Sequence, residues 1–243
     1  MRLLVSVASA AEASAALAGG ADVIDAKDPA AGALGAVSPD VFRDIHARVF
    51  GERPVTAALG DAADEGDIER AARAFALAGA RLVKVGFAGI ASAGRVGSLT
   101  AAAVRGARAG GHGTCGVVAV AYADSVAAES IAPAALVEVA ASAGAEGLLL
   151  DTANKTGPGL RGLMAPGALA TLVTRMHELG LFVALAGQLT ADDLPFVRDT
   201  GADVAGVRGA ACDAGRMGQV SADRVRLLQQ CNSTPTRKEW PWG

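Results

Sequence analysis

The chain has 243 residues, which is typical of a single (β/α)8 barrel and enough to bury a sizeable core. A net charge of −3 and an aromatic content of 4% exclude the basic surface and the stacking platform of a nucleic-acid-binding protein. No apolar run reaches the length of a membrane span, and three widely spaced cysteines without a Cys-x-x-Cys pair favour a reducing compartment. We therefore expect a cytoplasmic protein without nucleic-acid or membrane partners.

Short apolar strands alternate with helices along the chain. We predict strands over residues 3–7, 22–27, 55–59, 82–86, 116–122 and 182–186, and two more that end at Asp151 and Val207. Helices are expected over residues 9–18, from Ser38-Pro39, over 67–78, up to 109, and over 133–143, 166–179, 190–200 and 221–230. A capping box of Ser9 and Glu12 marks the first helix start.

Eight strands and eight helices in strict alternation predict an α/β protein with one (β/α)8 TIM barrel over residues 1–230. Residues 231–243, which include Trp240 and Trp242, break the pattern and are expected to form a C-terminal tail. The structural alternative is a doubly wound open sheet. Such sheets usually show a glycine-rich turn after the first strand, and residues 6–12 contain no glycine.

Four segments repeat one outline, in which a helix ends at Gly-Ala and a short strand follows, beginning at Gly20, Gly79, Gly144 and Gly201. Because a strand alternates faces with period two, their side chains fall into two sets. One set is wholly apolar, as expected under a layer of helices: Ile24, Ala26, Val83, Val85, Leu148, Leu150, Ala205 and Val207. The other set carries five charges near the strand ends: Asp25, Lys27, Lys84, Asp151 and Arg208. Since parallel strands are normally buried on both faces, these charges predict a site at the barrel mouth rather than a solvated face.

Lysine is rare in this chain, which holds 18 arginines and four lysines, and three of the four lie at or just after strand ends: Lys27, Lys84 and Lys155. A lysine can lose its proton and act as a nucleophile or base, whereas an arginine cannot. We expect Lys84 and Lys155 to lower the pKa of Lys27, so that its free amine can attack a carbonyl and form an imine. Asp25 and Asp151 can orient the amines or shuttle protons.

A phosphate site is predicted where barrels commonly hold phosphate, after the seventh and eighth strands. Gly187-Gln188 follow the seventh strand and Arg208-Gly209 the eighth. Backbone N–H groups of such turns and a guanidinium can bind a phosphate. We expect these residues to bind the substrate, with Arg208 in the same layer as Lys27.

The remaining candidates carry weaker signals. His46, His112 and His177 are scattered without metal-ligand spacing, so neither a metal nor another cofactor is predicted. Tyr122 ends a strand, where capping or packing is as good an explanation as catalysis. Asp61 either lines the site or caps the next helix.

Several motifs together resemble the (5-formylfuran-3-yl)methyl phosphate synthase family, and the similarity runs from Met1 to about Leu228. They include Gly-Gly-Ala-Asp-Val-Ile-Asp-Ala-Lys-Asp-Pro, Val-Lys-Val-Gly, Ala-Tyr-Ala-Asp, Leu-Asp-Thr-Ala-x-Lys, Ala-Leu-Ala-Gly and Val-Ala-Gly-Val-Arg-Gly-Ala-Ala-Cys. The chain departs from archaeal members at Asp28, where they tend to have Asn, and at Gln188, where they tend to have Ser.

The resemblance implies a barrel lyase of methanofuran-type cofactor biosynthesis. It implies the condensation of two glyceraldehyde 3-phosphate molecules to a furan aldehyde phosphate, with release of phosphate and water. It assigns the imine to Lys27 and proton transfer to Lys84, with Asp25, Asp151 and Lys155 in support. In a bacterium such a pathway would serve one-carbon oxidation.

Two other functions stay open from the sequence. One is another Schiff-base aldolase acting on a phosphorylated sugar, and the other is a non-catalytic barrel that binds a phosphate ligand. The order of steps, the triose isomer that forms the imine and assembly into a homo-oligomer also stay open.

Overall fold

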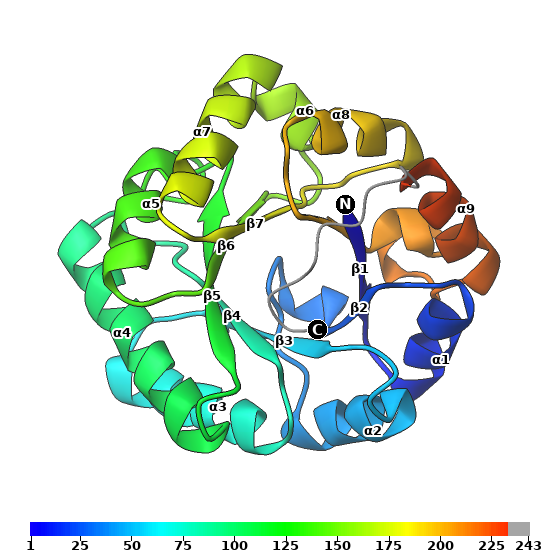
Figure 1. The fold of residues 1–243 in the computed structure, drawn as a ribbon, viewed down its shortest axis with the longest axis horizontal. Helices are drawn as coiled ribbons and strands as arrows, with labels where there is room; N and C mark the ends of the chain where they lie inside the picture. The colour runs from blue at the N-terminus through cyan, green and yellow to red at the C-terminus, as the bar shows by residue number, and fades with distance from the viewer. Residues whose placement is uncertain (233–243) are drawn as a thin grey trace.

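The computed structural model of the chain describes residues 1–232. Eight parallel strands pair in chain order and close into a barrel, with helices on the outside (Figure 1). The strands are β1 (Arg2–Val7), β2 (Val23–Ala26), β3 (Val55–Asp61), β4 (Leu82–Gly86), β5 (Gly116–Tyr122), β6 (Gly147–Asp151), β7 (Phe182–Leu185) and β8 (Val204–Val207). The predicted TIM barrel is confirmed.

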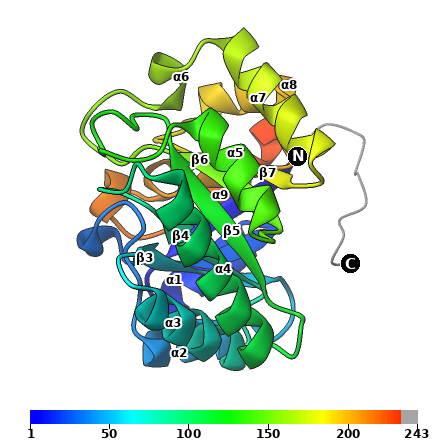
Figure 2. The same cartoon turned by 90° about the vertical axis from the view of Figure 1, so that its left-hand side faces the viewer.

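Helices follow the strands around the outside of the barrel, where, for example, α4 and α5 pack over β5 and β6 (Figure 2). The α-helices are α1 (Ala10–Ala18), α2 (Pro39–Val49), α3 (Glu65–Leu77), α4 (Ala93–Gly110), α5 (Pro133–Ser142), α6 (Leu160–Leu163), α7 (Pro166–Glu178), α8 (Leu194–Asp199) and α9 (Ala222–Asn232). Short 3-10 helices are η1 (Pro29–Ala31), η2 (Ala191–Asp193), η3 (Gly209–Ala211) and η4 (Gly215–Met217). No helix in residues 1–232 is both long and apolar enough to cross a membrane.

Most differences from the predicted elements lie at helix ends and in loops. The extra helix α6 lies in the connection from β6 to α7, and the helix predicted over 190–200 is divided into η2 and α8. Helix α3 begins earlier than predicted because Asp64 caps it, accepting a hydrogen bond from the Asp67 backbone. Helix α9 ends at Asn232, so the first two residues of the predicted tail belong to it. Trp240 and Trp242 lie outside the described residues.

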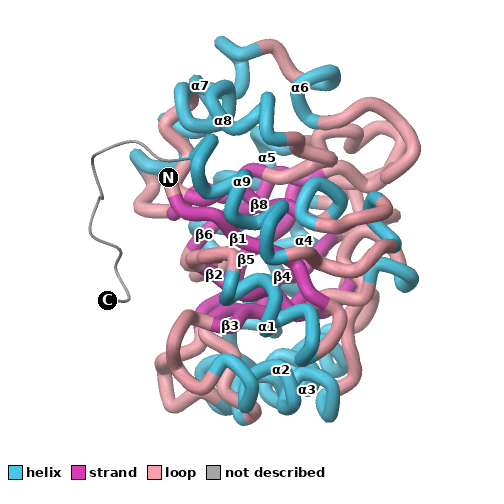
Figure 3. Tube along the Cα trace, turned by 90° about the vertical axis from the view of Figure 1, so that its right-hand side faces the viewer, coloured by secondary structure: helices cyan, strands magenta, loops and turns pink. Residues whose placement is uncertain are grey.

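Two apolar cores occupy the two faces of the strands, as the alternation of side chains predicts. The outward-facing set from Ile24 to Val207 is buried against the helices. The inward-facing set fills the lower part of the barrel: Ala58, Leu82, Val118, Val120, Leu149, Ala184 and Val204. Figure 3 shows the strands at the centre and the helices around them. Because small and branched side chains fill the interior, the space left for a ligand lies toward the carboxyl ends of the strands.

Candidate active site

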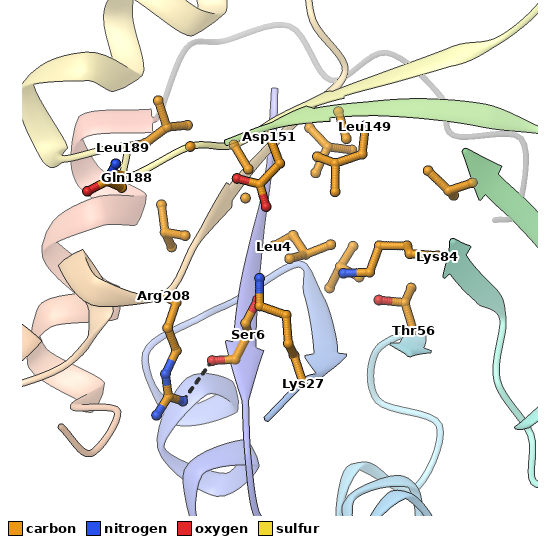
Figure 4. Close-up of a pocket in the computed structure, with 18 of the residues that line it drawn as sticks. Leu4, Ser6, Lys27, Thr56, Lys84, Leu149, Asp151, Gln188, Leu189 and Arg208 are labelled. Carbon is orange, nitrogen blue, oxygen red and sulfur yellow. Dashed lines mark hydrogen bonds between the residues drawn. The ribbon is translucent and has the colours of Figure 1, made fainter. Parts of the chain in front are cut away.

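A cavity of about 870 Å³, including open space at its mouth, lies inside the barrel. Its lower wall is apolar and includes Leu4, Leu82, Val118, Leu149 and Phe182. Its charged lining comprises Lys27, Lys84, Asp151, Lys155, Arg208 and Arg216. Figure 4 shows the side chains of Lys27, Lys84 and Asp151 directed toward the same central space. The structure therefore brings together the lysines and carboxylates that the strand alternation predicts.

The first pair is formed by Lys84, which lines the cavity, and Asp25, which is not among the lining residues. Asp25 is fully buried, and its carboxylate accepts hydrogen bonds from the hydroxyl groups of Ser6 at 2.9 Å and Thr56 at 2.7 Å. The Lys84 ammonium forms an ion pair with the same carboxylate and is itself buried. Because a buried charge is costly unless it is paired and hydrogen-bonded, these contacts hold both groups in one position.

The second pair is Lys155 with Asp151, which lies at the end of β6. The Lys155 ammonium lies 2.6 Å from Asp151 Oδ1 and 3.3 Å from the Thr152 hydroxyl. Asp151 also accepts a hydrogen bond from the Thr152 backbone at 2.8 Å. Burial acts to raise the pKa of Asp151, but the ammonium groups of Lys155 and Lys27 outweigh it and hold the pKa below its ordinary value. Asp151 is therefore a carboxylate at neutral pH.

Lys27 differs from the other two lysines, because within the described residues it has neither an ion pair nor a side-chain hydrogen bond. Its side chain is 7% exposed. Burial lowers the pKa of Lys27 from 10.5 to about 8; Lys84 and Lys155 act in the same direction, and Asp151 opposes them. The predicted lowering is thus present, but burial contributes more to it than the neighbouring cations do. A free amine is accessible at Lys27 near neutral pH.

Arg208 lines the cavity, but contacts within the protein occupy all five of its N–H donors. The guanidinium pairs with the buried carboxylate of Glu12, including one bond of 3.0 Å from Nη2 to Oε1. Its other bonds go to the carbonyl groups of Ser6, Arg216 and Gly218, each at 3.0 or 3.1 Å. Figure 4 shows the bond to Ser6. The phosphate contact of Arg208 stays a prediction, and it requires that one of these bonds be exchanged.

The Glu12–Arg208 pair joins α1 to β8, and Arg208→Ala is expected to lower the unfolding free energy by about 3–5 kcal/mol, because it leaves Glu12 buried without its counter-ion. Urea unfolding at neutral pH measures this loss. Arg161→Ala is the matched control, since it removes an exposed pair with Asp193 and should cost about 1 kcal/mol or less. If Arg208→Ala were as stable as the control variant, the Glu12–Arg208 pair would contribute little to the unfolding free energy.

The turn after β7 holds Gly187 and Gln188, both of which line the cavity. Gly187 adopts a φ of 103°, and an added Cβ would lie 3.0 Å from Thr152 Cγ2. The Gln188 amide donates to three carbonyl groups of the segment after β6, the shortest bond being 3.0 Å to Gly157. Gly209 begins η3 after β8. The structure thus places the predicted phosphate residues around the mouth, and their contact with phosphate stays a prediction.

Two residues that the sequence left open form one contact. The Tyr122 hydroxyl donates to Asp61 Oδ1 at 2.7 Å, and the same oxygen accepts from the Ala88 backbone at 2.9 Å. Burial and the Asp61 carboxylate raise the pKa of Tyr122, so its hydroxyl stays protonated. Because Tyr122 does not line the cavity, this contact ties β5 to β3 and to the loop after β4.

Three residues of the site were not predicted from the sequence: Ser6, Thr56 and Arg216. Ser6 and Thr56 hold Asp25, and their signal was a polar side chain at an inward position of β1 and β3. Arg216, on η4, has no strand or helix periodicity around it that could have marked it. Among residues 1–232, no group of His, Cys, Asp and Glu is arranged to hold a metal ion. Burial raises the pKa of Cys212, which leaves it without thiolate character.

Solved structures share this barrel. The chain matches 3-hexulose-6-phosphate synthase with a TM-score of 0.63 and 22% identity, covering 96% of this chain and 100% of that chain. It matches KGPDC from Streptococcus mutans with a TM-score of 0.65 and 16% identity, covering 95% of this chain and 96% of that chain. At these identities the likeness shows the fold alone.

Sequence relatives are closer. A (5-formylfuran-3-yl)methyl phosphate synthase of Methanopyrus kandleri is 40% identical over 232 residues, or 94% of this chain and 98% of its own length. One of Methanosarcina barkeri is 35% identical over 235 residues, or 96% and 100%. The family model described as 4-HFC-P synthase matches residues 3–229. These matches confirm the resemblance seen in the motifs, and the chain belongs to the 4-HFC-P synthase family.

Proposed function

We propose that this protein is a lyase that condenses two glyceraldehyde 3-phosphate molecules into (5-formylfuran-3-yl)methyl phosphate, for methanofuran-type cofactor biosynthesis. The observation that carries the proposal is Lys27, a buried lysine that has no counter-ion among residues 1–232 and lies near two lysine–carboxylate pairs. The relatives' names supply the product. The resemblance of the motifs supplies the substrate and the pathway.

The proposed reaction balances without an oxidant or a cofactor. Two triose phosphates contain the atoms of the furan product, one phosphate and two waters. Lys27 forms an imine with the aldehyde of the first triose, and loss of the C2 proton then expels phosphate from C3. The second glyceraldehyde 3-phosphate isomerises to its ketone when proton transfer moves a hydrogen from C2 to C1, and the terminal carbon of the enol then attacks the ketone carbonyl. The free C1 hydroxyl of the second triose closes the ring on C2 of the first, two waters are lost, and hydrolysis of the imine releases the furan aldehyde.

The two lysine–carboxylate pairs suit the proton transfers that these steps need. Lys84, paired with Asp25, and Lys155, paired with Asp151, both line the cavity that contains Lys27. Proton transfer by positioned groups accelerates such steps, and the imine acts as an electron sink for the carbanion at C2. The apolar lower wall limits water around the intermediate.

Incubation with glyceraldehyde 3-phosphate tests the proposal directly. A furan aldehyde absorbs in the near ultraviolet and a simple aldol does not, so the spectrum separates this function from another Schiff-base aldolase. The proposal requires one phosphate released for every two trioses consumed. If the protein binds the triose tightly but produces no near-ultraviolet absorbance and releases no phosphate, a non-catalytic phosphate-binding barrel would be favoured.

The rate should rise with pH through the pKa of Lys27. Only the deprotonated amine attacks a carbonyl, and a pKa of about 8 leaves roughly a tenth of Lys27 deprotonated at pH 7 and half at pH 8. We expect kcat/KM to rise about fivefold over that interval and to level off above pH 9. A profile of initial rates between pH 6.5 and 9.5 measures this. A flat or falling profile would show that the Lys27 amine does not limit the reaction.

A further inference from the structure

Five cationic side chains line the cavity, and three are paired with buried carboxylates: Lys84 with Asp25, Lys155 with Asp151, and Arg208 with Glu12. Lys27 and Arg216 have no such partner among the described residues. The proposed function uses Lys27 as the nucleophile. Of these five cations, Arg216 is therefore the one that is neither paired with a buried carboxylate of the described residues nor assigned a role in the proposed reaction.

Arg216 is held at the barrel mouth from two sides. Its Nη2 donates to the carbonyl groups of Pro29 at 3.1 Å and Gly32 at 2.5 Å, in the segment that follows β2. Its backbone carbonyl accepts from Arg208 Nε at 3.1 Å, and the Arg208 guanidinium also holds the Gly218 carbonyl. The guanidinium of Arg216 is thus fixed between the segments after β2 and β8, rather than free to move in solvent.

The remaining donors of Arg216 are available to a ligand. Its Nε and Nη1 make no hydrogen bond within residues 1–232. The half-buried position lowers the pKa of Arg216, opposed by the nearby carboxylates of Asp151 and Asp28, yet an arginine stays protonated at physiological pH. A partly desolvated cation with open N–H donors in a cavity suits an anion.

The position also fits the predicted phosphate site after β8. Gly209 opens that site, and a Cβ added to Gly209 would lie 3.4 Å from the Arg216 backbone nitrogen, so the two residues are adjacent. The predicted site needs a positive charge, and the donors of Arg208 are already occupied. Under the proposed function, the substrates that bind in this cavity and the phosphate that is released there are all anions.

We propose that Arg216 binds the phosphate group of a triose phosphate substrate, while the Arg208–Glu12 pair positions the loop that carries it. The proposal rests on the proposed function for the identity of the substrate. It assigns the predicted phosphate contact to Arg216 instead of Arg208, and it makes Arg208 a positioning residue that acts through its contacts with the backbone of Arg216 and Gly218.

Arg216→Gln, Arg216→Lys and the control Arg224→Gln test the proposal. Arg224 lies on the neighbouring α9, and its exposed pair with Asp213 makes Arg224→Gln a loss of the same charge outside the cavity. For Arg216→Gln we expect the KM for glyceraldehyde 3-phosphate and the Ki for inorganic phosphate to rise about 10- to 100-fold. Arg216→Lys should recover part of this affinity, and Arg224→Gln should stay within about twofold of the parent protein.

Two further measurements separate binding from structure. Phosphate-free glyceraldehyde, trapped with borohydride, should modify Lys27 equally in the parent protein and in Arg216→Gln. If Arg216→Gln loses that adduct too, or keeps the parent KM and Ki, the proposal is overturned. Inorganic phosphate should stabilise the parent protein against heat and should not stabilise Arg216→Gln. That result would support the Arg216 site even if the parent protein formed no furan. A parent protein that forms no furan would refute the proposed function alone.

Discussion

Lys27→Ala is expected to lower turnover by about 10⁴-fold or more and to abolish the borohydride-trapped adduct with glyceraldehyde 3-phosphate. The reason is that removal of a covalent nucleophile removes the route itself rather than one contact. In the parent protein, borohydride reduction in the presence of substrate should add a triose-derived mass to the peptide that contains Lys27. Peptide mass spectrometry and a furan absorbance assay measure the two effects.

The near-isosteric Lys27→Met is the control for folding. Since folding lowers the pKa of Lys27 from 10.5 to about 8, the unfolded chain holds this proton more tightly. Below pH 8, the buried charge of protonated Lys27 therefore lowers the unfolding free energy by about 3 kcal/mol. This cost disappears as the pH rises from about 8 to 10.5. Lys27→Met should be at least as stable as the parent protein at pH 7, yet inactive. An adduct on Lys84 or Lys155, or full activity without Lys27, would contradict the assignment.

Lys84→Arg and Lys84→Ala are each expected to lose about 10²- to 10⁴-fold in turnover while still binding substrate. Proton transfer needs a group that releases its proton, and an arginine holds its proton too tightly. The borohydride adduct on Lys27 should persist in Lys84→Arg, because the imine can form without the later proton transfer. Steady-state kinetics and adduct yield measured on the same samples test both parts.

The ion pair with Asp25 requires its own control. Lys84→Ala leaves a fully buried carboxylate without its cation, so a loss of activity could reflect a loss of folding. Lys84→Met combined with Asp25→Asn removes both charges and keeps the shapes close to the original. We expect this double variant to fold and to be inactive. Near-normal turnover of Lys84→Arg would show that Lys84 contributes only its charge.

Most of the fold could be predicted from the alternation of short apolar strands with helices. The strands predicted over 82–86 and 116–122 agree with β4 and β5, because a short strand between helices leaves few alternatives for its ends. The starts of helices depend on more local detail than the ends of these strands. Asp64 caps α3 ahead of the predicted start, and α6 is a single short helix within a loop, so both depend on local capping and packing rather than on a long periodic pattern.

The candidate site depends partly on the local sequence of each strand and partly on the closure of the barrel. Which face of a strand Lys27, Lys84 and Asp151 occupy is a local property, because each residue's direction follows from its neighbours along the strand. Their convergence followed from the barrel itself, in which all carboxyl ends of the strands meet at one mouth. The sequence was therefore sufficient to predict the lysines and carboxylates as one cluster.

Only the tertiary structure decided which charges pair and which remain free. Glu12 and Arg208 are 196 residues apart in the chain, and their contact exists because β1 closes the barrel against β8. That contact occupies the donors of Arg208, while Arg216 reaches the cavity from a loop without periodicity. Burial, which depends on all surrounding elements at once, has the largest effect on the pKa of Lys27. The face of a strand that a side chain occupies is set by its neighbours in the sequence. Its desolvation and its ionic partner are set by groups that meet only when the barrel closes.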